Sequence, residues 1–321
     1  MNQNFSIGLW SLDASGYWGN TPEDTVAKIR AASRIEHIKG IEVIYPTHVN
    51  ERNIKDVRKA AEDAHLSVIS VNPNLWTDKE FQKGALTSPD AATRRKALDY
   101  GKRSIDVAQG FGAGLMVLWP GQDGFDYPFQ HDYLELWNRE LEGVKEIAGH
   151  AKGHRIAVEY KPREPRGRSV VDSLSSGLLL ADQSGLDNVG VNLDFGHALM
   201  SRENPGESVQ KAMAMKRLFG IHFNDNYGQT DEDMTFLSVH HIEALEFLYY
   251  LEKTAYAGWI SVDIAPRRED AVEACSLCFR NILRLSHALG RIDEHALAEA
   301  RGAGDALRSQ ELVSAAIFGR T

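Results

Sequence analysis

Eight short segments rich in β-branched and apolar residues alternate with longer segments of helical spacing along this chain. The candidate strands are residues 6–10, 40–44, 67–71, 115–119, 156–159, 190–193, 219–223 and 259–263. Such alternation implies parallel strand pairing, because each helix returns the chain to the same end of the sheet. Eight units predict an α/β fold closed into a (β/α)8 barrel. The alternative is an open doubly wound sheet, but no glycine-rich dinucleotide loop follows the first strand.

The chain length fits this single barrel. A length of 321 residues would suggest two domains at about 150 residues each, but one (β/α)8 barrel commonly takes about 250 residues. We therefore expect a barrel catalytic domain over residues 1–290 and a C-terminal helical tail over residues 291–321. An amphipathic tail needs a surface on which to bury its apolar stripe. It could fold back on the barrel, but we assign it to subunit contact in a homo-oligomer, either a dimer or a tetramer.

Charge and hydropathy exclude several classes of partner. The chain has 36 Lys and Arg against 45 Asp and Glu, a formal net charge of −9, which gives no general attraction for nucleic acid. No apolar run approaches the roughly 20 residues that span a bilayer, and the polar N-terminus does not resemble a signal peptide. We expect a cytoplasmic protein without a membrane partner. The two cysteines, Cys275 and Cys278, share one face of a predicted helix and suit packing better than zinc or redox chemistry.

Metal-ligating side chains occur at the ends of four successive strands. Functional residues of such barrels lie at the C-terminal strand ends, and these ends carry Glu159, Asp194, His222 and Asp263. An aspartate that ends a strand often caps the helix or turn that follows. Four carboxylate or imidazole groups at one barrel mouth, however, would repel or desolvate one another without a cation. The mixed oxygen and nitrogen set predicts a divalent ion: Mn²⁺, Mg²⁺, Co²⁺ or Zn²⁺.

A second set of ligands follows in the next loops. If Asp194 bridges two ions, then His197, Asp231 and Asp233 could hold the second one; the alternative is a solvated acidic loop. Lys161 lies two residues after Glu159 and therefore on the same side of the strand. It could stabilise negative charge on a substrate oxygen, or it could form a structural salt bridge to one of the strand-end aspartates, Asp194 or Asp263.

Aromatic side chains are expected at the same rim. Trp10, Trp18 and Trp119 follow the first and fourth strands. Core packing explains most aromatic residues, but an indole at a strand end offers a flat apolar wall for the C–H face of a sugar. We therefore predict Trp10 and Trp119, and less strongly Trp18, as substrate-binding residues.

These motifs, over residues 5–274, resemble the xylose isomerase-like superfamily of barrel sugar isomerases and epimerases. The resemblance rests on Gly8-Leu9-Trp10, Trp119-Pro120-Gly121-Gln122-Asp123-Gly124, Val158-Glu159-Tyr160-Lys161-Pro162-Arg163, Asp194-Phe195-Gly196-His197, His222-Phe223-Asn224-Asp225, Asp231, Asp233 and Asp263. The pair Asp194 and His222 is similar to the L-rhamnose isomerase branch. The resemblance implies one ion on Glu159, Asp194, His222 and Asp263, and another on Asp194, His197, Asp231 and Asp233. This chain departs from the family pattern at one position. The family has a histidine that opens the sugar ring, but here His48 is displaced from the expected place and no substitute is evident.

The resulting hypothesis is a divalent-metal-dependent isomerase. It would interconvert an unphosphorylated aldose and ketose by metal-assisted 1,2-hydride shift, with one or two ions per subunit and Mn²⁺ as the first choice. Asp231 would move the hydroxyl proton through a metal-bound water, and Lys161 would stabilise the C1 oxygen. One alternative is a ketose 3-epimerase in which Glu159 and Asp263 exchange protons with the substrate. Another is a non-catalytic sugar- or metal-binding protein, which the missing histidine would favour.

Overall fold

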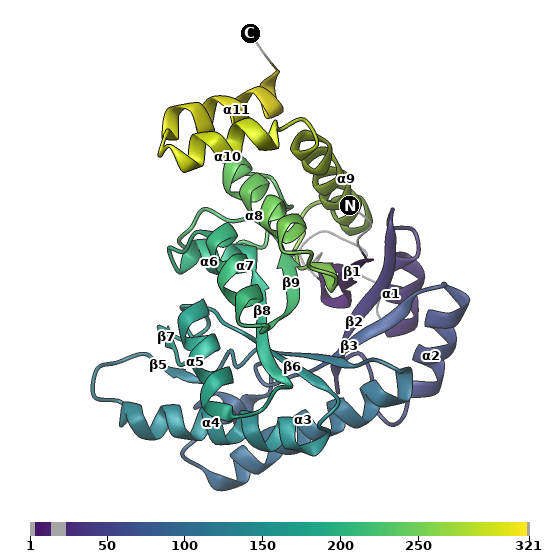
Figure 1. The fold of residues 1–321 in the computed structure, drawn as a ribbon. Coiled ribbons are helices and arrows are strands. Elements are labelled where there is room, and N and C mark those ends of the chain that lie inside the picture. The colour runs from purple at the N-terminus through teal and green to yellow at the C-terminus, as the bar shows by residue number, and fades with distance from the viewer. Residues whose placement is uncertain (1–3, 14–23, 320–321) are drawn as a thin grey trace.

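A computed structural model describes residues 4–13 and 24–319 of the chain. Eight parallel strands form a closed barrel in the order β1-β10-β9-β8-β6-β4-β3-β2 (Figure 1). The strands are β1 (Asn4–Gly8), β2 (Ile38–Tyr45), β3 (Ser67–Pro73), β4 (Leu115–Leu118), β6 (Arg155–Glu159), β8 (Val189–Asp194), β9 (Leu218–Phe223) and β10 (Trp259–Val262). A small antiparallel pair outside the barrel, β5 (Gly124–Phe125) with β7 (Arg168–Ser169), was not expected from the sequence.

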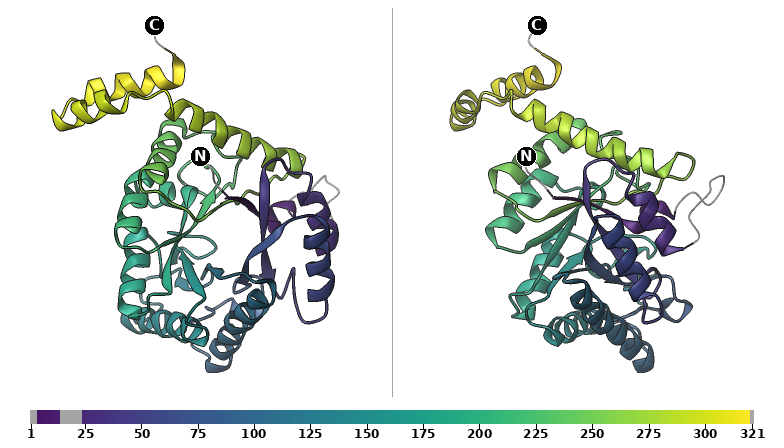
Figure 2. Two further views of the ribbon diagram at one scale, coloured as in Figure 1. Left: turned by 45° about the vertical axis from the view of Figure 1, so that its right-hand side comes forward. Right: turned by 90° about the vertical axis from the view of Figure 1, so that its right-hand side faces the viewer.

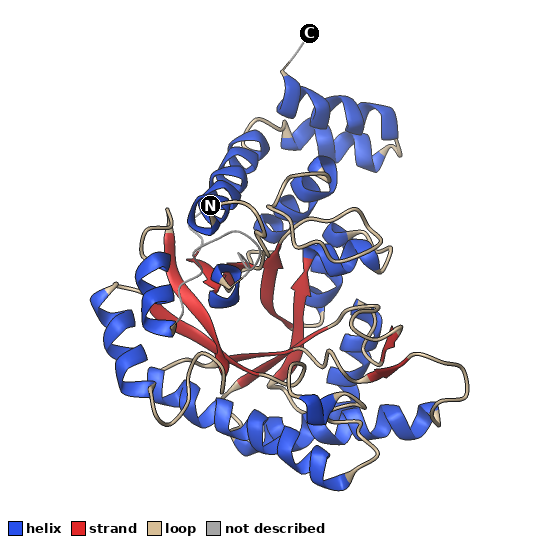
Figure 3. Cartoon of the chain, turned by 180° about the vertical axis from the view of Figure 1, so that it is seen from behind, coloured by secondary structure: helices blue, strands red, loops and turns tan. Residues whose placement is uncertain are grey.

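Helices surround the barrel, so that the strands are enclosed (Figures 2 and 3). They are η1 (Leu9–Leu12), α1 (Thr25–Ala32), α2 (Ile54–Asp63), η2 (Lys79–Phe81), α3 (Ala91–Phe111), α4 (Tyr133–His150), α5 (Leu174–Ser184), α6 (Phe195–Met200), α7 (Pro205–Ala214), α8 (His241–Lys253), α9 (Ala271–Leu289), α10 (Glu294–Gly302) and α11 (Ala306–Phe318). The prediction of a (β/α)8 barrel is confirmed. All eight strands overlap the predicted segments; β1, however, ends at Gly8, so Trp10 lies in η1.

Local sequence explains where many of these helices begin. The side chains of Asp90, Asp132 and Asp270 each accept a hydrogen bond from a backbone N–H in the first turn of α3, α4 and α9. This cap satisfies donors that have no partner inside the helix. Cys275 and Cys278 are fully buried on α9, and the Cys278 sulfur accepts a hydrogen bond from the Phe236 N–H at 3.3 Å. Both thiols therefore pack in the core, as predicted.

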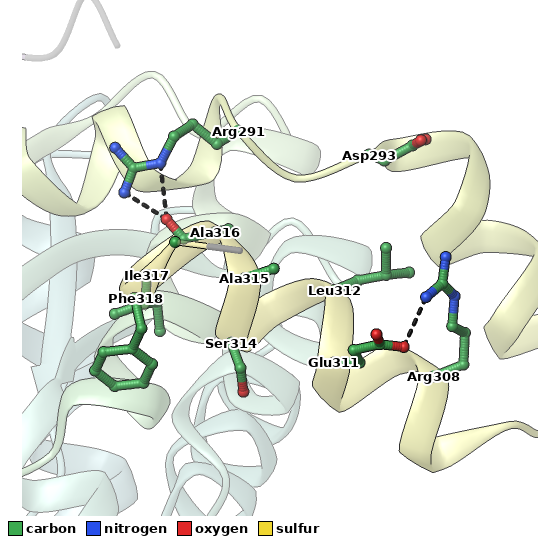
Figure 4. A pocket seen from close by; sticks show the side chains of 11 residues that line it. Arg291, Asp293, Arg308, Glu311, Leu312, Ser314, Ala315, Ala316, Ile317 and Phe318 are labelled. Atoms are coloured by element: carbon green, nitrogen blue, oxygen red, sulfur yellow. Dashed lines mark hydrogen bonds and ion pairs between the residues drawn. The ribbon is translucent and has the colours of Figure 1, made fainter. Parts of the chain in front are cut away.

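The C-terminal segment forms a helical hairpin, α10 and α11, that projects from one side of the barrel beyond α9 (Figures 1 and 2). The Arg291 guanidinium donates to the Ala316 carbonyl, with Nε at 2.8 Å, and ties the end of α11 to the end of α9 (Figure 4). On α11, Leu312 is buried, whereas Leu307 is 84% exposed and Phe318 79% exposed. The hairpin therefore covers part of its apolar surface within this chain and leaves part uncovered.

In the part of the chain that the structure describes, no helix is long and apolar enough to cross a membrane.

Candidate active site

A pocket of about 300 Å³ opens at the end of the barrel where the strands finish. Its lining includes most of the residues predicted from strand ends: Trp10, Trp119, Glu159, Lys161, His197, His222, Asp231, Asp233 and Asp263. A larger groove of about 1010 Å³ lies on the tail, between Arg291 and α11 (Figure 4). Among the described residues, the metal-ligating cluster lies in the barrel pocket and not in this groove.

Four predicted ligands meet at this end of the barrel; Glu159, His222 and Asp263 line the pocket, and Asp194 is fully buried next to them. Glu159, Asp194, His222 and Asp263 each offer one ligand atom, and these four atoms all lie within 4.8 Å of one another. Nδ1 of His222 is 3.1 Å from both Glu159 Oε2 and Asp263 Oδ2. Within the described residues, this buried nitrogen has no hydrogen-bond partner of acceptable geometry. A mixed set of carboxylate oxygens and one imidazole nitrogen suits a divalent cation, so these residues fit the expected metal.

Asp194 serves two structural roles at the start of α6. Its Oδ1 accepts the backbone N–H of His197 at 2.8 Å, which caps the helix, and its Oδ2 accepts the side-chain amide of Asn224 at 2.8 Å. The helix-cap interpretation of a strand-end aspartate is therefore correct, and it does not exclude a ligand role because each oxygen has a further lone pair. Burial raises the pKa of Asp194 to about 7; His197 opposes this rise, and the nearby carboxylates add to it.

Glu42 is a partner of this cluster, through His222, that the sequence did not reveal. It points into the barrel from the middle of β2 and is almost fully buried. Its Oε1 lies 3.2 Å from His222 Nε2, and its Oε2 accepts the Asn72 amide at 3.0 Å. Burial raises the pKa of Glu42, but the His222 imidazole outweighs this and leaves it below its ordinary value. A carboxylate inside the apolar run Ile41–Ile44 was the signal that could have identified it.

The imidazole of His222 lies between the carboxylates. Burial lowers the pKa of His222, but Glu159 and Glu42 together raise it well above its ordinary value. With Nε2 directed at Glu42, Nδ1 is the nitrogen that faces Glu159 and Asp263. The barrel therefore fixes which ring nitrogen is presented to the ligand cluster.

The second predicted ligand set is arranged around Asp231. Asp231 Oδ2 lies 3.0 Å from His197 Nε2 and 2.7 Å from Lys161 Nζ. The expected alternative of a Lys161 salt bridge to Asp194 or Asp263 is wrong, because the ammonium pairs with Asp231 and, at 3.6 Å, with Glu164. In the described part of the chain, His197, Asp231 and Asp233 do not form a separate compact ligand cluster with Asp194.

Charges in this second set perturb one another. Burial raises the pKa of Asp231, but His197 and Lys161 outweigh it and hold that pKa well below its ordinary value. Burial lowers the pKa of His197, yet Asp194 and Asp231 raise it to about 9. Burial, with Asp231 nearby, raises the pKa of Asp233 well above its ordinary value. Neighbouring carboxyl groups whose pKa values are shifted in opposite directions are typical of functional sites.

Indole rings form walls of the pocket. Trp10 Nε1 donates to Asp263 Oδ1 at 2.6 Å, so this ring also orients a candidate ligand. Trp119 packs against Trp76 with ring centroids 5.1 Å apart, and Lys161 Nζ lies 5.3 Å from the Trp119 ring centroid. Trp76 follows β3 and was not predicted. Trp18 lies outside the described residues.

Asp123 joins the loop that follows Trp119 to the segment before α3. This fully buried carboxylate accepts backbone N–H groups of Ala85, Leu86 and Thr87, at 2.8 to 3.2 Å. The Trp119 loop is thereby joined to the segment that leads into α3.

The displaced histidine, His48, lies behind the pocket wall. It is 1% exposed, and its Nε2 is 3.2 Å from Oδ2 of Asp13, a pocket residue.

The fold and the site define a (β/α)8 barrel protein with a candidate metal centre at the C-terminal ends of its strands. Residues 29–282 match the family described as xylose isomerase-like TIM barrel, and the chain belongs to this family. It is 31% identical to the xylose isomerase of Thermus thermophilus over 287 residues, which cover 83% of this chain and 72% of that protein. The family resemblance seen in the sequence is confirmed.

Solved structures show the same fold at lower identity. A D-tagatose 3-epimerase-like protein superposes with a TM-score of 0.72 at 19% identity, covering 88% of this chain and 98% of that one. The IOLI protein, whose crystal structure contains a zinc atom, has a TM-score of 0.67 at 16% identity, with coverage of 88% and 98%. These neighbours show the fold, and the family together with the xylose isomerase relative supports an enzyme of the sugar isomerase and epimerase class.

Proposed function

We propose that this protein is a divalent-metal-dependent aldose–ketose isomerase that acts on an unphosphorylated sugar by 1,2-hydride shift. The observation that carries the proposal is the cluster of Glu159, Asp194, His222 and Asp263, whose ligand atoms lie within 4.8 Å of one another in a pocket of about 300 Å³. The likeness to a xylose isomerase supports the same reaction class.

The cation would be held by Glu159, Asp194, His222 and Asp263. A second ion would take Asp194, His197, Asp231 and Asp233, and its binding would require these four side chains to move together. We propose Mn²⁺ as the first choice, with Mg²⁺, Co²⁺ and Zn²⁺ as alternatives, and one or two ions per subunit. When bound, a divalent ion would hold neighbouring substrate oxygens and polarise the carbonyl as a Lewis acid.

The remaining residues bind the sugar and move its protons. Lys161 would place its ammonium beside the substrate oxygen that gains negative charge. Asp231, held ionised by Lys161 and His197, would accept the proton of the substrate hydroxyl. Trp10 and Trp119 would pack against the apolar face of the sugar, as their place in the pocket lining allows.

A ketose 3-epimerase is the second candidate, favoured by the likeness to a D-tagatose 3-epimerase-like protein. Glu159 at the end of β6 and Asp263 directly after β10 both approach the same His222 nitrogen at 3.1 Å. In this reaction, one carboxylate would remove a proton from the substrate carbon and the other would return one to the opposite face.

The uncovered part of the α10–α11 hairpin supports subunit contact in a homo-oligomer, with residues 291–321 as the contact segment. Leu307 and Phe318 expose their apolar side chains on α11. A contact with a second subunit would cover these side chains.

The test is a substrate panel. Purified protein with Mn²⁺ would be incubated with aldoses and ketoses of five and six carbons, and the products identified by chromatography and NMR. An aldose–ketose pair at equilibrium supports the isomerase, and inversion at C3 of a ketose supports the epimerase. If no sugar in the panel is converted, both proposals fail.

A further inference from the structure

The pocket wall after β1 and β2 carries a carboxylate–imidazole pair that the proposed roles do not use. Asp13 lines the pocket beside Thr47 and Asn74, and its side chain is 37% exposed. His48 lies behind it, buried, with Nε2 3.2 Å from Asp13 Oδ2. Asp13 can therefore contact a molecule bound in the pocket, whereas His48 cannot.

The protein backbone fixes the tautomer of this imidazole. The N–H of Ile44 donates to His48 Nδ1 at 3.2 Å, and a ring nitrogen that accepts a hydrogen bond carries no proton. The ring proton is therefore on Nε2 and is directed at Asp13. The His48 carbonyl is held in turn by Thr25 Oγ1 at 2.7 Å and by Asn53 Nδ2 at 2.9 Å. His48 is thus a fixed donor to the Asp13 carboxylate.

Asp13 is held as a carboxylate. Burial raises its pKa, but the hydrogen bonds from His48 and Lys28 outweigh burial and leave the pKa below its ordinary value. Lys28 pairs with Oδ1, and His48 donates to Oδ2. The carboxylate is therefore ionised and oriented. Its Oδ1 is buried beside Lys28, which leaves Oδ2 as the oxygen that would accept the proton of a bound hydroxyl.

Pentoses and hexoses are hemiacetal rings in water, and isomerisation or epimerisation next to a carbonyl needs the open chain. We infer that Asp13 is the catalytic group that opens the sugar ring, and that His48 is its positioning residue. This inference rests on the proposed action on sugars.

In the proposed ring opening, Asp13 carries one proton from the anomeric hydroxyl to the ring oxygen. Asp13 takes the proton of the anomeric hydroxyl, and the O–H electron pair becomes the second bond of the carbonyl. The bond between the anomeric carbon and the ring oxygen breaks, its electron pair stays on the ring oxygen, and that oxygen takes the proton from Asp13. The carboxylate is regenerated, and no oxidant, reductant or co-reactant is needed.

The test measures ring opening separately from isomerisation. Crystalline α-D-xylose, α-L-rhamnose and every aldose that the substrate panel shows to be converted would be dissolved with the protein, and anomer interconversion followed by NMR or polarimetry. The native protein is expected to accelerate it, before and after chelation of metal. Asp13→Asn should lower this acceleration about 100-fold or more, within the usual range for general acid–base groups. His48→Leu should lower it about 10-fold, and His48→Gln, which retains an N–H donor, should recover most of the loss.

Controls keep a folding defect apart from a catalytic one. Asp63→Asn is the matched control, because Asp63 also pairs with a lysine, Lys59, at 2.9 Å but is exposed on α2. Asp13→Glu, which keeps the carboxylate, should recover part of the rate, and circular dichroism should show every variant folded.

Undiminished anomer exchange in folded Asp13→Asn overturns the inference, as does acceleration that disappears on chelation. If the protein converts a sugar but does not accelerate anomer interconversion, only the inference about Asp13 is overturned. If it accelerates anomer interconversion but converts no sugar, only the proposed function is overturned. Absence of both activities overturns both.

Discussion

Glu42 Oε1 lies 3.2 Å from Nε2 of His222, on the opposite side of the imidazole from the Nδ1 atom that faces Glu159 and Asp263. A carboxylate in this place fixes the ring orientation and makes the other nitrogen a better ligand. Glu42 is buried inside the barrel and lies outside the pocket lining, so its effect on the pocket passes through His222.

Replacing Glu42 by Gln should weaken divalent-metal binding by about 10- to 100-fold, the usual effect of losing a carboxylate partner of a ligating histidine. Calorimetric titration with Mn²⁺ would measure it. Glu146→Gln, an exposed carboxylate paired with Lys102 at 2.7 Å, is the matched control. Equal affinities for the native protein and the Glu42 variant would show that Glu42 does not position the ligand.

Removal of divalent metal should abolish sugar conversion, and Mn²⁺ or Co²⁺ should restore it. Metal binding to the native state should also raise Tm with increasing metal concentration, because a ligand that binds only the folded state stabilises it. Activity assays and calorimetry before and after chelation would measure both effects. Full activity in a preparation verified as metal-free would contradict the metal-dependent proposal.

Asp231→Asn should separate the two candidate reactions. This carboxylate accepts contacts from Lys161 at 2.7 Å and from His197 at 3.0 Å. If it accepts the hydroxyl proton, kcat of aldose–ketose conversion should fall about 100-fold or more. A 3-epimerase that works through Glu159 and Asp263 should keep most of its activity. Product analysis of the variant on the converted sugar would distinguish these outcomes.

Glu140 on α4 should make stability depend on pH. It is fully buried, and neither carboxyl oxygen has a hydrogen-bond partner within the described residues. Burial, with Asp123 nearby, raises its pKa well above the ordinary value. The unfolded chain therefore loses this proton at a lower pH than the folded protein, and the free energy of unfolding falls as pH rises above the ordinary glutamate range.

Glu140→Met should remove this dependence. The apolar side chain leaves no carboxyl group to ionise, so we expect a gain of about 1–3 kcal/mol in the free energy of unfolding at pH 8. The gain should be smaller at pH 4, where Glu140 of the unsubstituted protein is largely protonated in both the folded and the unfolded state. Urea unfolding at the two pH values would measure it, with the exposed Glu146→Met as control. An equal effect at both pH values would rule out titration of Glu140 as the cause.

Much of the fold and part of the site follow from sequence pattern. The alternation of apolar and helical segments predicts the barrel, and because functional residues of such barrels lie at the C-terminal strand ends, it also predicts Glu159, Asp194, His222 and Asp263 at one rim. Glu42 and His222 are separated by 180 residues, so only the closed sheet brings them together. The Asp13–His48 contact depends in the same way on two loops whose conformations a single sequence does not encode in any periodic pattern.

The Asp123 carboxylate connects the Trp119 loop to the segment before α3 by hydrogen bonds, so a change in the conformation of one segment affects the other. A change of substrate size is therefore hard to obtain by altering one of these loops alone, because a new loop shape would strip three buried N–H groups of their acceptor. Efforts to widen or reshape the pocket on this side should exchange both segments together and retain the aspartate between them.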